Sequence, residues 1–484
     1  MTLLGLLAAN AVLALAGAGA LMLTGTWYRL APASRIAPAL LAGFALAAVA
    51  LPPLIYLGLS PTPLVTGALA LAVLLAGYLR RRRTPVHATP DASGGGLLVF
   101  GIAAAASIPL LVRAASEPLV KFDAYADWVL KARSLYGHGG IFSGAFDTHM
   151  LSHYYLASHR EYPLGLPAIE AFDFHMMGAA DARLIHLQFV FLAAAFGGTV
   201  WSLLRPRVDA RILAATLLLF AVAPGLHTQV LSAYADVPTA CVWAVSALAF
   251  GLWLLGDGED RLALGALLAA GTLATKQEGI VLDAALVAVV ALALGMRRRG
   301  PLALRFGIAV GCVALTAVPW QAWVRAHDLH DADIAPSIGR MADQAHTLPA
   351  IVHRLGAELL WLKWPGIVAL AVVAALVLLL RRRDPVAAGY LALLAASTAG
   401  VAVVYWNARI PVDGLLTQSA ERVVTAPILL SVAALPLLIA RVGTRGARLC
   451  AGACTGAWPP DGTRLRKVPG WPRPPSARRS PPPA

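Results

Sequence analysis

Three ionisable residues spaced four apart are the strongest candidates for chemistry in this sequence. Asp123, Asp127 and Lys131 lie in a stretch with few helix breakers, so on a helix their side chains would share one face. Two carboxylates placed in this way could bind a divalent ion, or one could act as a general base toward a hydroxyl group. The alternative is an exposed amphipathic helix on a membrane surface with solvated charges. The spacing leaves both open.

Further acids and bases stand beside apolar segments later in the chain. Glu161 and Tyr162 precede a proline, and Asp236 precedes a long apolar run. Lys276 and Glu278 share a short turn between two apolar segments. Ionisable groups at membrane depth are costly, so this turn indicates either function or a mutual salt bridge. Lys276 could meet an anionic phosphate, or the pair could reach the membrane interface with its charges in water.

Two arginines flank the last candidate loop. Arg409 follows Trp406 and Asn407, and Arg422 follows Glu421 just before the final apolar segment. Each arginine needs an anionic partner, which could be Glu421, a lipid headgroup or a phosphorylated substrate.

Membrane-spanning helices must position these residues, because 59% of the 484 residues are hydrophobic and only 13% are charged. A soluble fold has about 25% charged residues. Segments of about 17 to 25 apolar residues can cross a bilayer. The sequence predicts thirteen of them, several of them short: residues 1–25, 36–59, 62–79, 96–115, 183–204, 211–226, 237–255, 261–275, 279–295, 302–323, 365–380, 386–405 and 423–440.

Arginine blocks predict the orientation of these helices. With thirteen spans, five blocks fall on one side, which the positive-inside rule assigns to the cytoplasm. The blocks include residues 80–83, 205–211, 297–299, 381–383 and 441–448. The net charge of +14 therefore reports membrane orientation, and we expect no nucleic-acid partner. The acids and bases above then face the exterior.

The sequence divides into three parts. Residues 1–94 predict a three-helix membrane segment and a cytoplasmic linker, and residues 95–440 predict a transmembrane domain with long outer loops at about 116–182 and 325–363. The Pro- and Arg-rich residues 441–484 have the composition of a disordered cytoplasmic tail. The outer loops lack a cysteine pair, so we expect no disulfide framework there.

Five short motifs resemble those of the GT-C superfamily of polyprenyl-phosphate-dependent glycosyltransferases, relatives of the protein O-mannosyltransferases and the aminoarabinose transferases, and most closely an uncharacterised bacterial branch. The resemblance covers about residues 96–440. Two residues depart from it: Leu164 stands where many relatives have a second proline, and Gln277 replaces an asparagine. The motifs are residues 122–132, 161–167, 234–238, 276–279 and 419–422.

The resemblance implies a GT-C-like bundle of about thirteen transmembrane helices with a long first catalytic outer loop. It implies an integral membrane enzyme of the bacterial inner membrane, with its active site facing the periplasm. The enzyme would transfer a hexose or pentose from a polyprenyl-phosphate donor to an envelope glycan, lipid or protein acceptor, usually with inversion. A divalent cation, Mg²⁺ or Mn²⁺, is left open because superfamily members differ in this respect.

The roles of individual residues follow from the same resemblance. Asp123 would be the catalytic base, and Lys276 and Arg422 would stabilise the departing phosphate. The full set expected to bind substrate is Asp127, Glu161, Tyr162, Asp236, Lys276, Glu278 and Arg422.

Two other classes of function remain. A transporter or flippase of an envelope precursor would bury ionisable groups near the midplane of broken helices. A structural assembly protein would use the outer polar layer for docking. The concentration of polar groups in one outer layer, and the lack of a P-loop motif, favour a transferase with a lipid-linked donor.

Overall fold

The chain is helical, as the sequence predicts. The computed structural model describes residues 2–81, 95–138, 159–296, 300–329, 334, 337–360 and 363–443. Within these ranges the only strand-like feature is an isolated bridge between Ile334 and Ala408. The described residues belong to one compact unit. Most of the predicted linker and almost all of the predicted tail lie outside the described residues.

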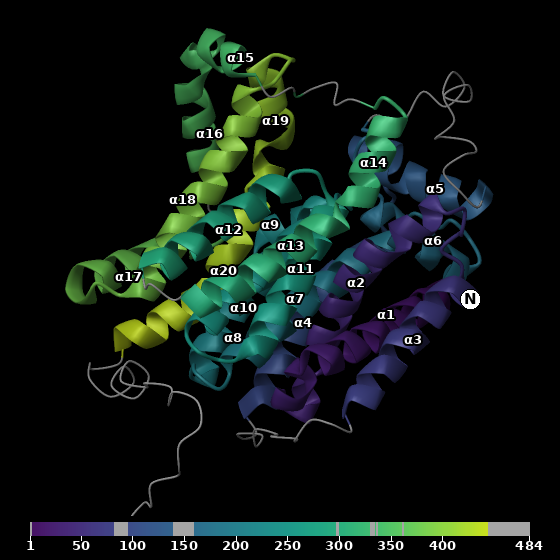
Figure 1. The fold of residues 1–484 in the computed structure, drawn as a ribbon, viewed down its shortest axis with the longest axis horizontal. Helices are drawn as coiled ribbons and strands as arrows, with labels where there is room; N and C mark the ends of the chain where they lie inside the picture. The colour runs from purple at the N-terminus through teal and green to yellow at the C-terminus, as the bar shows by residue number, and fades with distance from the viewer. Residues whose placement is uncertain are drawn as a thin grey trace, which may run out of the picture. The chain divides into compact units, whose positions relative to one another are not determined.

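The N-terminal half of the chain folds into the helices α1 to α10 (Figure 1). Their bounds are α1 (Thr2–Thr24), α2 (Ile36–Tyr56), α3 (Pro63–Arg81), α4 (Gly95–Ser116), α5 (Val129–His138), α6 (Gly165–Met177), α7 (Ile185–Leu204), α8 (Ala210–Ala221), α9 (Pro224–Val230) and α10 (Asp236–Leu254).

The C-terminal half continues with further apolar helices and a group of shorter helices, α15, α16 and α19, at one end (Figure 1). Their bounds are α11 (Glu259–Thr275), α12 (Gly279–Met296), α13 (Gly300–Thr316), α14 (Val318–Ala326), α15 (Ile338–Asp343), α16 (Leu348–Leu360), α17 (Ile367–Arg382), α18 (Pro385–Trp406), α19 (Val412–Val423) and α20 (Thr425–Gly443).

The architecture is that of a multi-pass membrane protein. Each of the thirteen predicted apolar segments overlaps a helix. Among the described residues, nine helices are long and apolar enough to cross a membrane, or ten if α8 and α9, bent by 56° at their junction, count as one span. Helices α11 and α17 are shorter, with 17 and 16 residues. Nine spans are thus supported, and thirteen stays a prediction.

Small residues allow the helix backbones to approach closely. A Cβ atom at Gly17 would lie 1.7 Å from the carbonyl oxygen of Ala39, and one at Gly43 would lie 1.8 Å from that of Leu13. Helices α1 and α2 therefore cross in direct backbone contact, as is usual where apolar lipid gives little drive for association. Helix α10 is the most buried of the nine and packs against α7, α11 and α20.

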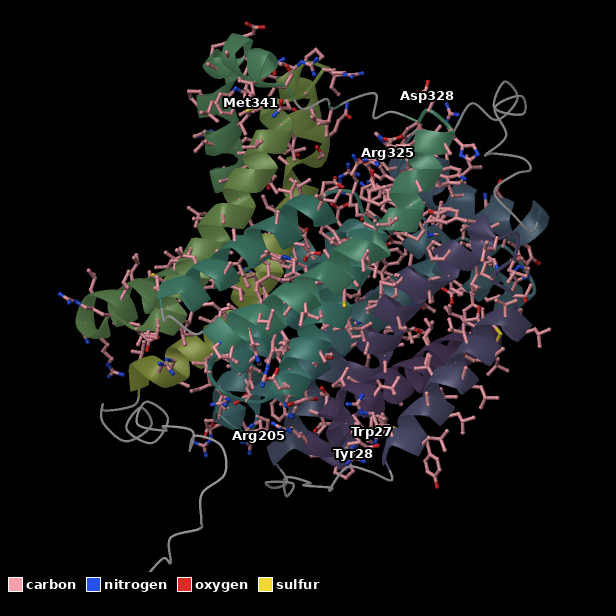
Figure 2. The ribbon with its side chains drawn as sticks, in the orientation of Figure 1. Trp27, Tyr28, Arg205, Arg325, Asp328 and Met341 are labelled. Atoms are coloured by element: carbon pink, nitrogen blue, oxygen red, sulfur yellow. The ribbon has the colours of Figure 1, made fainter. Side chains whose placement is uncertain are left out.

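The two ends of the helices carry different residues. Trp27, Tyr28 and Arg205 lie at one end, and Arg325 and Asp328 lie at the other (Figure 2). This separation agrees with the predicted grouping of Arg205 with the arginine blocks and of residues 325–363 with the outer loops. We call the two ends inner and outer, and their orientation in a membrane stays a prediction.

Candidate functional site

A fully buried lysine organises the first outer connection. Asp127 lies in a π-helical turn, Ala124–Trp128, that leads directly into α5. The Lys131 ammonium lies 2.5 Å from the Asp127 carboxylate, and neither side chain is more than 2% exposed. The four-residue spacing thus produces the predicted pair. Solvated charges on a membrane-surface helix do not describe these two residues.

The same lysine holds the chain where it returns to the bundle. Lys131 Nζ donates to the carbonyl oxygen of His159 at 2.5 Å, and the His159 imidazole lies 3.2 Å from the Glu161 carboxylate. The Tyr162 ring stacks on His159, with centroids 4.6 Å apart. The Trp320 indole of α14 donates to the Glu161 carbonyl at 2.7 Å. Lys131, His159, Glu161 and Tyr162 therefore form one buried contact group with Asp127.

Asp123 points elsewhere and meets the other end of the chain. Its carboxylate accepts a hydrogen bond from Arg422 Nη1 on α19, 299 residues away. The Arg422 guanidinium lies over the Tyr234 ring, 4.3 Å from its centroid. A π-helical turn has more residues per turn than an α-helix, and this turn lets Asp123 and Asp127 face different partners. Asp123 is 36% exposed, which makes it the accessible carboxylate of the pair.

Lys276 joins two helix termini in a third group. Its ammonium lies 2.8 Å from Asp236, the first residue of α10, and 2.8 Å from Glu278, just before α12. Gly165 at the start of α6 packs against the neighbouring turn, because a Cβ atom there would lie 2.2 Å from the carbonyl oxygen of Ala274. The mutual salt bridge considered from the sequence is present, and it is buried at the outer end.

These three groups lie within electrostatic range of one another. The Asp123 charge raises the pKa of Asp127, and the Arg422 charge lowers the pKa of Lys276. All eight predicted site residues therefore converge. We call them, together with Lys131, His159 and Tyr234, the outer cluster.

Burial and neighbouring charges shift the pKa values of these residues in opposite directions. Burial raises the pKa of Asp127, although the nearby Lys131 charge lowers it. Burial alone would lower the pKa of Lys276, but the Asp236 and Glu278 charges outweigh it and raise the pKa. Burial would also lower the pKa of His159, but its hydrogen bond to Glu161 and the charges of Asp127 and Glu161 raise it. These charges therefore favour the protonated forms of Lys276 and His159.

The loop after α18 connects that helix to the segment before α15. Asn407 accepts from the Ser337 backbone N–H at 2.9 Å and donates to the Val403 carbonyl at 2.9 Å. Glu421 pairs with Lys363 at 3.0 Å, so the partner of Arg422 is Asp123 and not its neighbour Glu421. Arg409 is exposed.

An apolar groove lies beside the outer cluster. It is small, with a volume of about 20 Å³, and Trp320 forms part of its wall. Proline residues of α2, of the loop before α6 and of α14 also line it: Pro52, Pro53, Pro163 and Pro319. Because Trp320 also holds the Glu161 carbonyl, the groove is continuous with the polar groups.

Sequence reasoning missed several buried ionisable residues. Glu170 and Asp173 on α6 and Asp283 on α12 are buried, and their carboxylate oxygens accept no hydrogen bond within the described parts of the chain. Their signal was available, since each is an acid inside an otherwise apolar helix. The structure also brings Lys131, His159 and Tyr234 into contact with the predicted site residues.

Neither similarity to known proteins nor a metal-binding group assigns a role to the outer cluster. No family model, no curated protein and no solved structure matches this chain significantly. In the ranges that the structure describes, no three His, Cys, Asp or Glu side chains converge as a metal-binding group. The predicted divalent cation therefore stays a prediction, and the site must be interpreted from its own geometry.

Proposed function

We propose that the protein is an integral membrane glycosyltransferase of the GT-C type. It would transfer a sugar from a polyprenyl-phosphate donor to an envelope acceptor hydroxyl at the outer end of the bundle, on the periplasmic side of the bacterial inner membrane. The observation that carries the proposal is the contact between Asp123 and Arg422. An accessible carboxylate beside a guanidinium supplies both a base and a phosphate ligand at one place.

Asp123 would take the proton from the acceptor hydroxyl as its oxygen attacks the anomeric carbon of the sugar. The bond from that carbon to the lipid phosphate oxygen breaks, and the phosphate leaves with the bonding electrons. This displacement inverts the anomeric centre. Arg422 would stabilise the departing phosphate, and its Nε atom donates no hydrogen bond within the described residues.

The other residues support this pair. Lys276 already contacts two carboxylates, so it would contribute positive charge from behind Arg422 while holding Asp236 and Glu278 for the sugar. Asp127, Glu161 and Tyr162 would define the opposite wall. The hydrocarbon chain of the donor would lie against the apolar surface beside Trp320, whose indole contacts the Glu161 carbonyl.

A transfer assay tests this proposal. Purified protein in nanodiscs would be incubated with radiolabelled polyprenyl-phosphate sugars and a cell-envelope extract. Asp123→Asn should reduce transfer by about 10²- to 10⁴-fold, the usual contribution of a general base. Asp413→Asn, an exposed aspartate on the same helix as Arg422, is the matched control and should retain activity. No product from the wild type, or equal transfer by Asp123→Asn, would contradict the proposal.

Two observations favour a transporter or flippase as the second candidate. Helices α8 and α9 form a broken span that leads into Tyr234, and Asp283 is buried within α12. Proteoliposomes loaded with a labelled lipid-linked precursor distinguish the two. Movement of label across the bilayer without a new glycosidic product would favour transport, and product formation without such movement would favour the transferase.

A further inference from the structure

Helix α6 carries two carboxyl groups that the proposed reaction does not use. Glu170 and Asp173 are three residues apart, so they lie on adjacent turns of one face. Both residues are 0% exposed. None of their four carboxylate oxygens accepts a hydrogen bond from the residues that the structure describes. An ionised carboxylate in such a place costs several kcal/mol unless a partner compensates it.

The helices around α6 offer few compensating charges. Helix α6 packs against α1, α2, α3, α5 and α11. Helices α1 and α2 contain no charged residue. The charges of α3 are at its C-terminal end and those of α11 at its first turn, the end opposite to Ala274 and its contact with Gly165. On α6 itself, His175 contacts Tyr136, and burial lowers its pKa.

The π-helical turn and α5 contribute the remaining charged groups. Arg133 on α5 is exposed. The negative charge of Asp127 adds to the burial that raises the pKa of Glu170. Lys131 is the buried cation of this region, and it already contacts Asp127 and the His159 carbonyl. The neutral forms of Glu170 and Asp173 are therefore favoured.

The carboxyl groups form a series that runs inward from the accessible end of the cluster. The Asp123 charge raises the pKa of Asp127, and the charges of Asp127 and Asp173 raise the pKa of Glu170. The exposed fraction falls along this series, from 36% at the Asp123 side chain to 2% at the Asp127 side chain and zero at Glu170 and Asp173. Burial raises the pKa of both inner groups well above the ordinary range.

We propose that Glu170 and Asp173 form a proton-binding site that is loaded from the outer end of the bundle through Asp123 and Asp127. With both protons bound, Lys131 has one anionic partner and keeps its contact with the His159 carbonyl. Loss of the Glu170 proton places a second negative charge near Asp127. The Lys131 ammonium is then attracted by two carboxylates, and its contact with the His159 carbonyl weakens. The state of this site then determines how firmly the chain is held at His159. This inference does not depend on the proposed transfer reaction.

Infrared spectroscopy of the full-length protein in nanodiscs tests the proposal, because protonated carboxyl groups have a distinct carbonyl band that shifts in D₂O. At neutral pH the wild type should show this band. Glu170→Gln and Asp173→Asn should each remove one carboxyl contribution, and the double variant should remove both. Glu117→Gln is the control, since Glu117 is exposed and paired with Arg113, and it should leave the band unchanged. A wild type without the band at neutral pH overturns the proposal and requires no variant to fold.

The direction of loading is tested separately. Deuterium exchange of the same band should slow in Asp127→Asn, because the substitution removes the carboxyl between Asp123 and Glu170. Exchange as fast as that of the wild type would overturn the route through Asp127. Loss of the band in Glu117→Gln would overturn the assignment to α6.

Discussion

The outer and inner ends of the bundle both carry ion pairs, but the pairs mostly differ in burial. The exception at the inner end is the buried pair of Asp260 and Arg261. At the inner end, Arg305 pairs with Glu259 at 2.5 Å with more than half of each side chain exposed. Arg207 pairs with Asp257, and Arg441 pairs with Asp384. At the outer end, the Lys131 side chain is 0% exposed, and the Lys276 side chain is 8% exposed.

This difference separates two uses of charge. The inner acids near the α10–α11 turn hold arginines from other loops, such as Arg29, Arg207 and Arg305, and most of these arginines remain hydrated. Exposed pairs contribute little to stability, about 0 to 1 kcal/mol each. Buried pairs carry a desolvation cost that stability alone does not justify. The outer cluster is therefore where function is expected, and the inner pairs report orientation and connect loops.

Removing the Lys131 charge should have the largest effect on stability. Lys131→Met leaves the Asp127 carboxylate buried without its cation, which should cost about 3 to 5 kcal/mol. The thermal unfolding midpoint of the protein in nanodiscs measures it. Lys131→Met combined with Asp127→Leu should restore most of the loss, because an apolar pair of similar size needs no desolvation. A single variant as stable as the wild type would remove the contrast between the two ends.

Asn407 tests whether neutral hydrogen bonds at the outer end matter as much as its charges. Asn407→Ala removes the acceptor for the Ser337 N–H and the donor to Val403, and we expect a loss of about 1 to 3 kcal/mol. Thr417→Ala is the control, since the Thr417 hydroxyl makes one exposed bond to the Asp413 carbonyl. Equal unfolding midpoints for the two variants would show that the Asn407 hydrogen bonds do not stabilise the outer end.

His159 gives the outer end a pH dependence. Its pKa is raised in the folded state, so the stabilisation it provides is complete below the unfolded pKa of about 6.5 and is lost as pH rises through the folded pKa. The wild-type unfolding midpoint should therefore fall across this window relative to that of His159→Gln. A difference that grows with rising pH would have the wrong sign.

The smallest effect is expected at the inner end. Arg305→Met removes an exposed pair with Glu259 and should change the free energy of unfolding by no more than about 1 kcal/mol. The same unfolding measurement checks it beside Lys131→Met. A larger loss than that of Lys131→Met would reverse the comparison.

Local patterns in the sequence predicted local structure well. Apolar segments predicted the helices, because a backbone surrounded by lipid must satisfy its polar groups with internal hydrogen bonds. The spacing of Asp127 and Lys131 predicted their pair because residues four apart are neighbours on a helix. The count of spans was less predictable, since α11 and α17, with 17 and 16 residues, lie at the lower limit of the length that crosses a bilayer.

Long-range partners were beyond sequence reasoning. Nothing in the chain near Asp123 indicates that its partner is Arg422 or that Tyr234 underlies that guanidinium, because helix packing decides both. The π-helical turn that separates Asp123 from Asp127 was also unforeseen, since their spacing suggested a shared face. Glu170 and Asp173 lie on α6, a short helix within the segment at about 116–182 that the sequence predicts as an outer loop, so their burial was not predictable.

The contact between Asp123 and Arg422 also constrains how the chain is assembled during synthesis. Asp123 leaves the ribosome about 300 residues before its partner, so helices α5 to α18 are inserted while this carboxylate still lacks its guanidinium. Lys276 follows Asp236 by only 40 residues and can pair much earlier. The outer end is therefore completed last, and a chain that stops before α19 would present an incomplete, acid-rich surface to the quality-control machinery of the membrane.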